Sequence, residues 1–332
     1  MVTRTLEGLG EPAYRTGQVW QWAAQGAACY ESMTNLPLGL RRALGAAVPF
    51  STLTVEHEAN ARDGTVKALF CTHDGLPVEA VLMLYRDGRR SLCLSSQSGC
   101  PLTCTFCATG QMRFARNLSA WEILDQVLHF RRSTRSQDEG DPVNHAVFMG
   151  MGEPMMNLDS VLGACERLPG TGITHRRTAI STVGWIPGIE RLTEHPLPLR
   201  LALSLHAADE ALRSELMPVN DRYPLADVLA ACESFHRRTC GKRGMVFVEY
   251  VMLAGVNDSH PQAVQLAEIL DPRVFKVNLI PYNPTGSVYA ASSPKAIGAF
   301  KDELQRRGLS ATVRLTRGRD IDAACGQLAG RS

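Results

Sequence analysis

From about residue 91 onward, the chain alternates short apolar stretches with amphipathic ones. Seven stretches have the length and composition of β-strands: Ser91–Ser96, Ala146–Met149, Arg177–Ser181, Leu199–Ser204, Val246–Leu253, Val274–Ile280 and Ala311–Leu315. Helix signals separate them, among them a capping box at Ser119-Ala-Trp-Glu122 and a helix start at Ser293-Pro294. Alternating strands and helices predict an α/β fold with a parallel sheet. Six or so units predict a closed or partly closed barrel, with a doubly wound sheet as the alternative.

The first ninety residues follow a different pattern. Gln18–Ala28 and Leu36–Val48 are typical of helices, whereas Thr65–Cys71 and Val78–Tyr85 are typical of strands. We therefore predict a helical domain over 1–50, a β extension over 51–90 and a barrel over 91–332.

Composition excludes several classes of protein. Lysine and arginine total 35 against 33 aspartate and glutamate, so the formal net charge is +2, which excludes a polybasic binder and an acidic tail protein. Apolar runs stay short of the ~18 residues that span a bilayer, and the N-terminus lacks the apolar stretch of a signal peptide. We expect a soluble, cytoplasmic protein that does not contact membranes.

Three of the ten cysteines fall within eight residues, as Cys100-Pro-Leu-Thr-Cys104-Thr-Phe-Cys107. Thiolates this close on one loop can bind a single soft-metal centre. A structural zinc site requires a fourth ligand, and the next cysteine, Cys165, lies on an apolar helical stripe typical of core. An iron–sulfur cluster with three protein ligands fits better, and a zinc loop or three unconnected thiols remain the alternatives.

Polar or glycine residues follow the predicted strands, where barrel enzymes place reactive groups. They are Gly152 and Glu153 after the second strand, Ser181 after the third, Ser204, Leu205 and His206 after the fourth, and Asn283 after the sixth. Singly, each has an ordinary alternative as a tight turn, a helix cap or a loop residue. Their shared position at one rim of a barrel favours a binding site.

Two further cysteines and one carboxylate stand apart from the triplet. Cys325 follows Arg314, Arg317 and Arg319, whose positive charge is expected to favour the thiolate. Cys93 lies in the strand Leu92-Cys93-Leu94, where the ordinary alternative is a buried core thiol. Glu79 lies in an apolar β-like stretch, and on an edge strand it would only face water.

The Cys100–Cys107 spacing resembles the signature of the radical S-adenosylmethionine (SAM) superfamily, and Phe106 matches its usual aromatic residue. Further segments are similar to the RlmN/Cfr family of RNA methyltransferases: Leu9-Gly-Glu-Pro-Ala-Tyr-Arg, Met33-Thr-Asn-Leu-Pro, Ser95-Ser-Gln-Ser-Gly-Cys100, Arg116-Asn-Leu, Gly150-Met-Gly-Glu-Pro, Ser181-Thr-Val-Gly, Ser204-Leu-His-Ala, Met217-Pro-Val-Asn and Asp320-Ile-Asp-Ala-Ala-Cys325-Gly-Gln-Leu. The resemblance covers about residues 8 to 328, and its N-terminal segments favour the RlmN type.

The resemblance implies a partial (β/α)6 barrel, a 4Fe–4S cluster on Cys100, Cys104 and Cys107, and two SAM molecules per turnover. SAM would contact Gly152, Glu153, Ser181, Ser204, Leu205, His206 and Asn283. Cys325 would carry the methyl group as S-methylcysteine and form a transient covalent adduct with RNA. Glu79 would be the proton acceptor, and Cys93 would release the product by forming a transient disulfide with Cys325.

The implied substrate is structured RNA, namely C2 of an adenosine in 23S ribosomal RNA, with transfer RNA as a further candidate. An external electron donor such as flavodoxin and a monomeric state are also implied, with 1–50 as an RNA-binding type of domain. Local basic patches would have to bind the RNA: Arg41-Arg42, Arg131-Arg132, His175-Arg176-Arg177, Arg237-Arg238 and Lys242-Arg243. Three alternatives stay open: Cfr-type C8 methylation, a radical SAM enzyme acting on a peptide or small molecule, and a non-enzymatic zinc protein.

Overall fold

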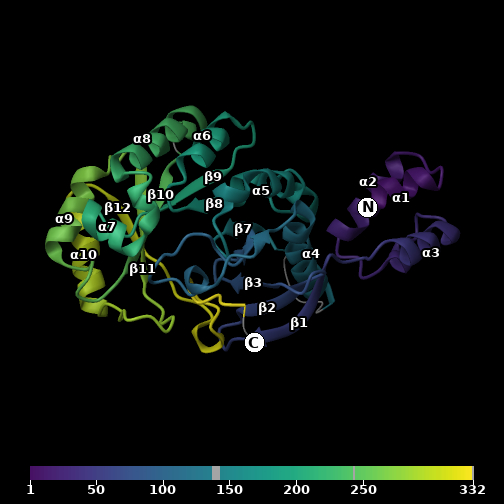
Figure 1. The fold of residues 1–332 in the computed structure, drawn as a ribbon, viewed down its shortest axis with the longest axis horizontal. Coiled ribbons are helices and arrows are strands. Elements are labelled where there is room, and N and C mark those ends of the chain that lie inside the picture. Colours follow the sequence, from purple (N-terminus) through teal and green to yellow (C-terminus); the bar gives the residue numbers. More distant parts are fainter. Residues whose placement is uncertain (137–142, 242–243, 331–332) are drawn as a thin grey trace.

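The computed structural model describes residues 1–136, 143–241 and 244–330, and it is built on one ten-stranded sheet (Figure 1). Seven of its strands run parallel: β4 (Arg90–Cys93), β7 (His145–Phe148), β8 (Thr178–Thr182), β9 (Arg200–Ser204), β10 (Val246–Met252), β11 (Phe275–Pro281) and β12 (Ser310–Val313). Each of the seven predicted strands is found within a few residues of its predicted place.

The sheet forms an open, curved barrel. Strands β4 to β12 follow one another in chain order, and within the described residues β12 pairs with β11 alone. A doubly wound sheet reverses its strand order at a switch point, and this one does not, so that alternative is wrong. The prediction of a partial barrel is confirmed.

Helices connect the parallel strands. They are α4 (Ala120–Ser136), α5 (Leu158–Cys165), α6 (Ile186–Glu194), α7 (Glu210–Leu216), α8 (Leu225–Phe235), α9 (His260–Ile269) and α10 (Pro294–Arg306). Figure 1 shows α6, α8, α9 and α10 around the outside of the curved sheet. Their apolar stripes pack on it: Ile297, Phe300 and Leu304 of α10 are buried in the same core as Val248 and Leu279 of the strands.

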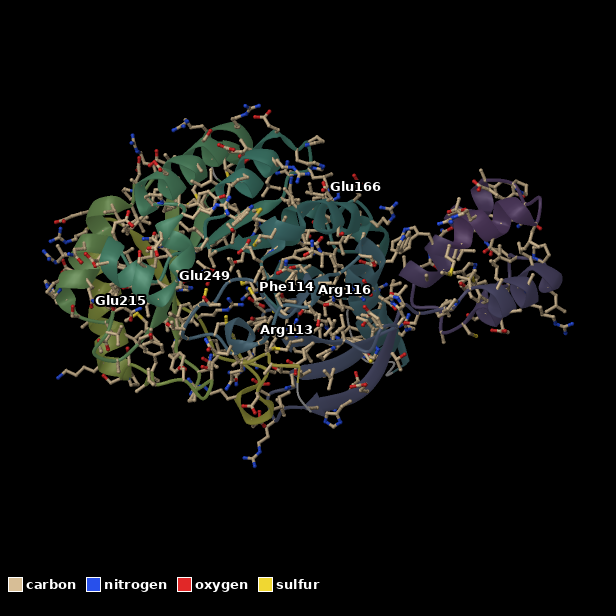
Figure 2. All side chains as sticks on the ribbon, viewed as in Figure 1. Arg113, Phe114, Arg116, Glu166, Glu215 and Glu249 are labelled. Atoms are coloured by element: carbon tan, nitrogen blue, oxygen red, sulfur yellow. The ribbon has the colours of Figure 1, made fainter. Side chains whose placement is uncertain are left out.

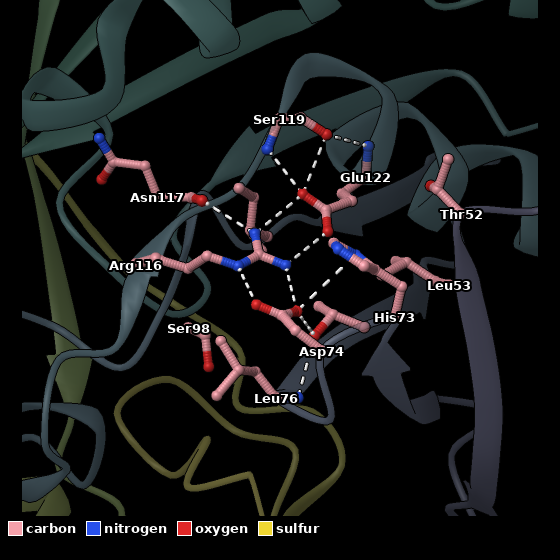
Figure 3. Close-up of polar contacts among 12 residues, drawn as sticks. Thr52, Leu53, His73, Asp74, Leu76, Ser98, Arg116, Asn117, Ser119 and Glu122 are labelled. Atoms are coloured by element: carbon pink, nitrogen blue, oxygen red, sulfur yellow. Dashed lines mark hydrogen bonds and ion pairs between the residues drawn. The ribbon is translucent and has the colours of Figure 1, made fainter. Parts of the chain in front are cut away.

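Both predicted helix starts are present. Ser293 Oγ accepts a hydrogen bond from Ala296 N at 3.1 Å, and Ser119 and Glu122 cap each other at the start of α4. Arg116, from the short strand β6 (Arg116–Asn117) that pairs with β5 (Gln97–Ser98), bridges Glu122 to Asp74 (Figure 3).

The first fifty residues form three helices, α1 (Val2–Gly8), α2 (Tyr14–Ala24) and α3 (Leu38–Ala47). They share a small core of their own that includes Leu6, Met33 and Leu44, and Figure 1 shows them to one side of the barrel. Trp20 of α2 contacts Trp121 of α4 edge to face, with 6.1 Å between ring centroids.

Strands β1 (Leu53–Asn60), β2 (Val66–Thr72) and β3 (Pro77–Leu84) extend the barrel sheet. They pair antiparallel with one another, and β3 pairs antiparallel with β4. Consequently β3 is an interior strand, which excludes the alternative that Glu79 faces water from an edge. Among the described residues, the longest apolar helices are too short or too polar to cross a bilayer.

Candidate functional site

A cavity opens at the carboxyl ends of the parallel strands. Nine of the residues predicted to act together line it: Cys100, Cys104, Cys107, Gly152, Glu153, Ser181, Ser204, His206 and Cys325. The rim position predicted from the strand pattern therefore brings residues from five separate segments to one place. Leu205 and Asn283 lie behind the lining.

The loop of three cysteines is held by backbone hydrogen bonds from two directions. Thr105 N donates to Leu216 O at 3.0 Å, and Ala108 N donates to Gly326 O at 2.8 Å. At Gly110, an added Cβ would lie 2.7 Å from the Cys104 carbonyl oxygen, so the loop closes only around glycine. The hydrogen bond from Ala108 N to Gly326 O holds the loop against the C-terminal segment that carries Cys325.

All three thiols of the loop line the cavity. Burial raises the pKa of Cys100 to about 12 and that of Cys104 well above its usual range. Within the part of the chain that the structure describes, no group of three or more His, Cys, Asp or Glu side chains is arranged to hold a single metal ion. Three cysteine thiols on one loop are the ligand type of an iron–sulfur cluster.

Glu153 is a buried carboxylate held by nearby backbone N–H groups and by the Thr182 side chain. Its Oε1 accepts a hydrogen bond from Met155 N at 3.0 Å and its Oε2 accepts one from Val183 N at 3.0 Å. Burial raises the pKa of Glu153 to about 7, although both N–H groups oppose the shift. The preceding Gly152 has φ +93°, and a Cβ there would lie 2.4 Å from the Gln97 side chain, so glycine is required for the close approach.

His206 is held as a neutral ring. Its Nδ1 accepts a hydrogen bond from Val251 N at 3.0 Å, which leaves the proton on Nε2. Burial, and then the charge of Arg213, lower the pKa of His206 to about 3. The ring packs edge to face on Phe106 with 4.7 Å between centroids, and its backbone has φ +61°. Ser181 and Ser204 lie beside it, their hydroxyls 3.2 Å apart.

Leu205 and Asn283 act from behind the cavity wall. The Leu205 side chain is fully buried in the barrel core. Asn283 Nδ2 donates to Cys325 O at 3.3 Å, and its Oδ1 accepts from Arg319 Nε at 3.2 Å. Asn283 therefore contacts the Cys325 segment directly.

Cys325 lies within the C-terminal segment, defined here as residues 317–330. Its side chain is exposed, but to the solvent inside the cavity, so protein surrounds it on most sides. Burial raises the pKa of Cys325, and Arg314 lowers it by less. The expectation that the arginines favour the thiolate is therefore wrong in its net effect, because burial outweighs the charge of Arg314. Arg317 pairs with Asp63, and Arg319 donates a hydrogen bond to Asn283.

Cys93 ends strand β4 in a cluster with Ala323 and Leu328 of the C-terminal segment. Burial raises the pKa of Cys93 to about 12, and the charge of Cys325 adds to that rise. Both thiols are free in the structure. Cys93 thus packs against the segment that carries Cys325.

Glu79 lies outside the first cavity and lines a second one. Its side chain is fully buried, and its Oε1 lies 3.0 Å from Lys67 Nζ. Its Oε2 accepts hydrogen bonds from Ala329 N at 2.8 Å and Gly330 N at 3.0 Å. The structure therefore joins Glu79 to the same C-terminal segment.

Sequence reasoning missed three charged residues that position the site: Lys67, Arg213 and Glu249. Arg213 is fully buried and donates to Leu205 O and Val183 O, which ties two strand-end loops together. Glu249 of β10 lines the cavity, accepts from Asn278 Nδ2 at 3.0 Å and lies 3.6 Å from Arg314 Nη1 (Figure 2). Lys67 and Glu249 could have been noticed in the sequence, because each is a charged residue inside an otherwise apolar predicted strand.

Several predicted basic patches are engaged within the chain. Arg41 donates to Leu36 O, Arg132 pairs with Asp125, and Arg238 pairs with Glu194. The Lys242-Arg243 patch lies outside the described residues.

Comparison with known proteins agrees with this geometry. A sequence model described as the Radical SAM superfamily matches residues 94–267. A probable dual-specificity RNA methyltransferase RlmN from Chloroflexus aurantiacus is 46% identical to this chain. The alignment covers 99% of this chain and 90% of that protein. A dual-specificity RNA methyltransferase RlmN from Anaeromyxobacter sp. (strain Fw109-5) is also 46% identical. Its alignment covers 98% of this chain and 87% of that protein.

The crystal structure of a radical SAM methyltransferase from Sphaerobacter thermophilus is also similar. It superposes with a TM-score of 0.93 at 41% identity, covering 99% of this chain and 97% of that one. The match spans the N-terminal helices, the β extension and the barrel together. The chain belongs to the radical SAM superfamily and, within it, to the RlmN family of radical SAM methyltransferases.

Proposed function

We propose that this enzyme methylates C2 of an adenosine in 23S ribosomal RNA and in transfer RNA, through a methyl group carried on Cys325. The names of its relatives support an RNA substrate. The observation that carries the proposal is the position of Cys325, which lines the same cavity as Cys100, Cys104 and Cys107 although it lies near the other end of the sequence.

The cavity offers the residues that the family's cofactors require. Cys100, Cys104 and Cys107 would hold a 4Fe–4S cluster, and SAM would lie against the other strand ends: Gly152, Glu153, Ser181, Ser204 and His206, with Leu205 and Asn283 behind them. When bound, the cluster and two SAM molecules per turnover supply a transferable methyl group and the radical chemistry for hydrogen abstraction. Cys104 and Glu153 are buried where they line the cavity, whereas Cys325 faces the solvent in the cavity.

Cys325 would accept the methyl group on its sulfur, losing the thiol proton as the S–C bond forms. Arg314 is the cation whose charge lowers the pKa of Cys325 against the effect of burial. The Cys325 carbonyl is held by Asn283 Nδ2 and that of Gly326 by Ala108 N, so the sulfur is presented from a fixed backbone. The carbon acquired there would then bond to the adenine ring.

Two further residues would complete the reaction. Glu79 would take the proton that the ring carbon loses. Cys93 as thiolate would attack Cys325 sulfur, so that an S–S bond forms, the S–C bond breaks, and the product carbon keeps the electron pair and takes up a proton. The packing of Cys93 against Ala323 and Leu328 supports this second role. An external electron donor such as flavodoxin would restore the thiols and feed the cluster.

The target base must leave its stack to reach a cavity of this kind. We therefore expect structured RNA to be methylated and free adenosine not to be. Because both proposed RNA substrates are found in the cytoplasm, we place the enzyme there, acting as a monomer.

The test is nucleoside mass spectrometry after anaerobic reaction of the cluster-loaded protein with SAM and ribosomal or transfer RNA. We expect 2-methyladenosine from both RNAs and none from Cys325→Ala, which retains its brown cluster. Recovery of 8-methyladenosine would move the enzyme to C8 chemistry. Methylation of free adenosine at a comparable rate would overturn the RNA requirement.

A further inference from the structure

The C-terminal segment separates the first cavity from a second one. Gly326 and Leu328 line the first cavity, whereas Gln327 and Ala329 line the second. The segment that carries Cys325 is therefore a thin wall, with the cysteine triplet on one side and Glu79 on the other.

The wall is fastened to the cysteine loop at its middle. Ala108 N donates to Gly326 O at 2.8 Å, and Thr109 Oγ1 donates to Leu328 O at 2.6 Å. These contacts follow directly from the loop that carries Cys107. They hold the backbone just after Cys325, at Gly326 and Leu328. They do not hold residues 329 and 330.

Glu79 holds that end of the wall. Its Oε2 accepts hydrogen bonds from both Ala329 N and Gly330 N, at 2.8 and 3.0 Å. Gly330 lies close enough to the sheet that a Cβ would be 2.9 Å from Pro77 Cγ, at a φ of +63°. The end of the segment is thus docked tightly on strand β3.

Lys67 is the charge partner that this arrangement requires. Strands β2 and β3 pair Leu69 with Glu79 and Lys67 with Val81, which makes Lys67 and Glu79 diagonal neighbours on one face. Their side chains are 10% and 0% exposed, and Nζ lies 3.0 Å from Oε1. Lys67 Nζ also donates to Asp322 O at 3.5 Å, at the other end of the wall. A buried carboxylate without a cation would lose its charge and weaken its hold on the two N–H groups.

We propose that Lys67 is a positioning residue that acts through Glu79, and that the two form a clasp holding the Cys325 segment over the first cavity. The proposal rests on the proposed function, since it gives the clasp its use. While Glu79 accepts hydrogen bonds from residues 329 and 330, it is not free to accept a proton from a substrate. Release of the clasp and exposure of the base are one event.

The test is hydrogen–deuterium exchange of the full chain, cluster-loaded and without RNA. In Lys67→Met we expect exchange within residues 318–330 to rise by about tenfold, because the clasp opens more often, while strands β8 to β11 keep their exchange rates. Iodoacetamide should alkylate Cys325 faster in the same variant. Lys67→Arg keeps the cation and should restore both rates, and Lys295→Met, an exposed lysine of α10, should change neither.

Unchanged exchange within residues 318–330 in Lys67→Met would overturn the proposal. If that variant instead loosens the whole of β2 and β3, Glu79→Gln decides the matter, because it retains the size of the side chain. Faster exchange confined to the segment in Glu79→Gln supports the clasp, and unchanged exchange contradicts it. None of these measurements uses RNA methylation, so a failure of the proposed function is recorded separately.

Discussion

Glu153 and Glu79 are both buried carboxylates beside the Cys325 segment, but they are held in opposite ways. Glu153 is fixed by the N–H groups of Met155 and Val183, close by in the fold and independent of the C-terminal segment. Glu79 is fixed by a lysine and by two N–H groups at the end of the segment itself.

Glu153 is held by the barrel alone, whereas the position of Glu79 depends on the position of the C-terminal segment. Because the barrel supplies both donors to Glu153, that carboxylate keeps its position whatever the C-terminal segment does. Glu79 loses two of its three partners whenever residues 329 and 330 move. The place of Glu153 in the first cavity is therefore preformed, whereas the place of Glu79 in the second depends on a distant part of the chain.

The largest loss of stability is expected when Glu79 loses its cation, Lys67. Lys67→Met leaves a buried carboxylate without its cation and should lower the free energy of unfolding by roughly 3 kcal/mol. Lys67→Met with Glu79→Leu should recover most of that loss, because no charge is then buried. Urea unfolding followed by circular dichroism measures both. A double variant as unstable as the single one would show that the charge is not the cause.

Glu153 should make stability fall as the pH rises. Its pKa of about 7 lies above the ordinary value of 4.5, so between these two values the folded chain holds a proton that the unfolded chain has lost. Rising pH then favours the unfolded state, by about 3 kcal/mol in total. Urea midpoints of wild type and Glu153→Gln should diverge between pH 5 and 7. Parallel curves would contradict the assignment.

Glu122 gives the opposite slope at a smaller amplitude. Arg116 and Ser119 together hold its pKa below the ordinary value of 4.5 despite burial (Figure 3). A lowered folded pKa stabilises above the unfolded value, and this stabilisation is lost as the pH falls. Arg116→Gln should cost about 1 kcal/mol at pH 7 and less near pH 4. Equal losses at both values would indicate packing rather than charge.

The smallest effect is expected for an exposed carboxylate. Asp159 pairs with Arg191 on the surface, where the side chains are 86% and 55% exposed. Solvent screens such a pair, so Arg191→Gln should leave the thermal midpoint unchanged. A clear drop would mean that burial is not what makes the effects at Glu153 and Glu79 larger than the effect at Asp159.

Local patterns were sufficient for the barrel. Apolar runs and caps at Ser119 and Ser293 act within a few residues, so the strands and helix starts could be predicted from them. The cysteine triplet and the strand-end residues were likewise found from spacing, and the cavity lining includes all of them except Leu205 and Asn283.

Long-range contacts were beyond such patterns. Nothing near Lys67 in the sequence indicates that Glu79 and Asp322 would meet it. Arg213 was missed for the same reason, because its acceptors, Leu205 O and Val183 O, are backbone atoms of other strand ends. In the sequence alone, an arginine that is buried and donates such bonds cannot be told from one that faces solvent. The arginines near Cys325 show the reverse error, since two of them are engaged elsewhere.

Along the wall between the cavities, Gln327 and Ala329 lie on one side and Leu328 lies on the other. The residues therefore alternate between the two cavities at this point. An insertion or deletion of one amino acid just after Cys325 would exchange the cavities that Leu328 and its neighbours line, and it would move the N–H groups of residues 329 and 330 away from Glu79. The chain length between Cys325 and Gly330 is thus constrained as strictly as the residues themselves.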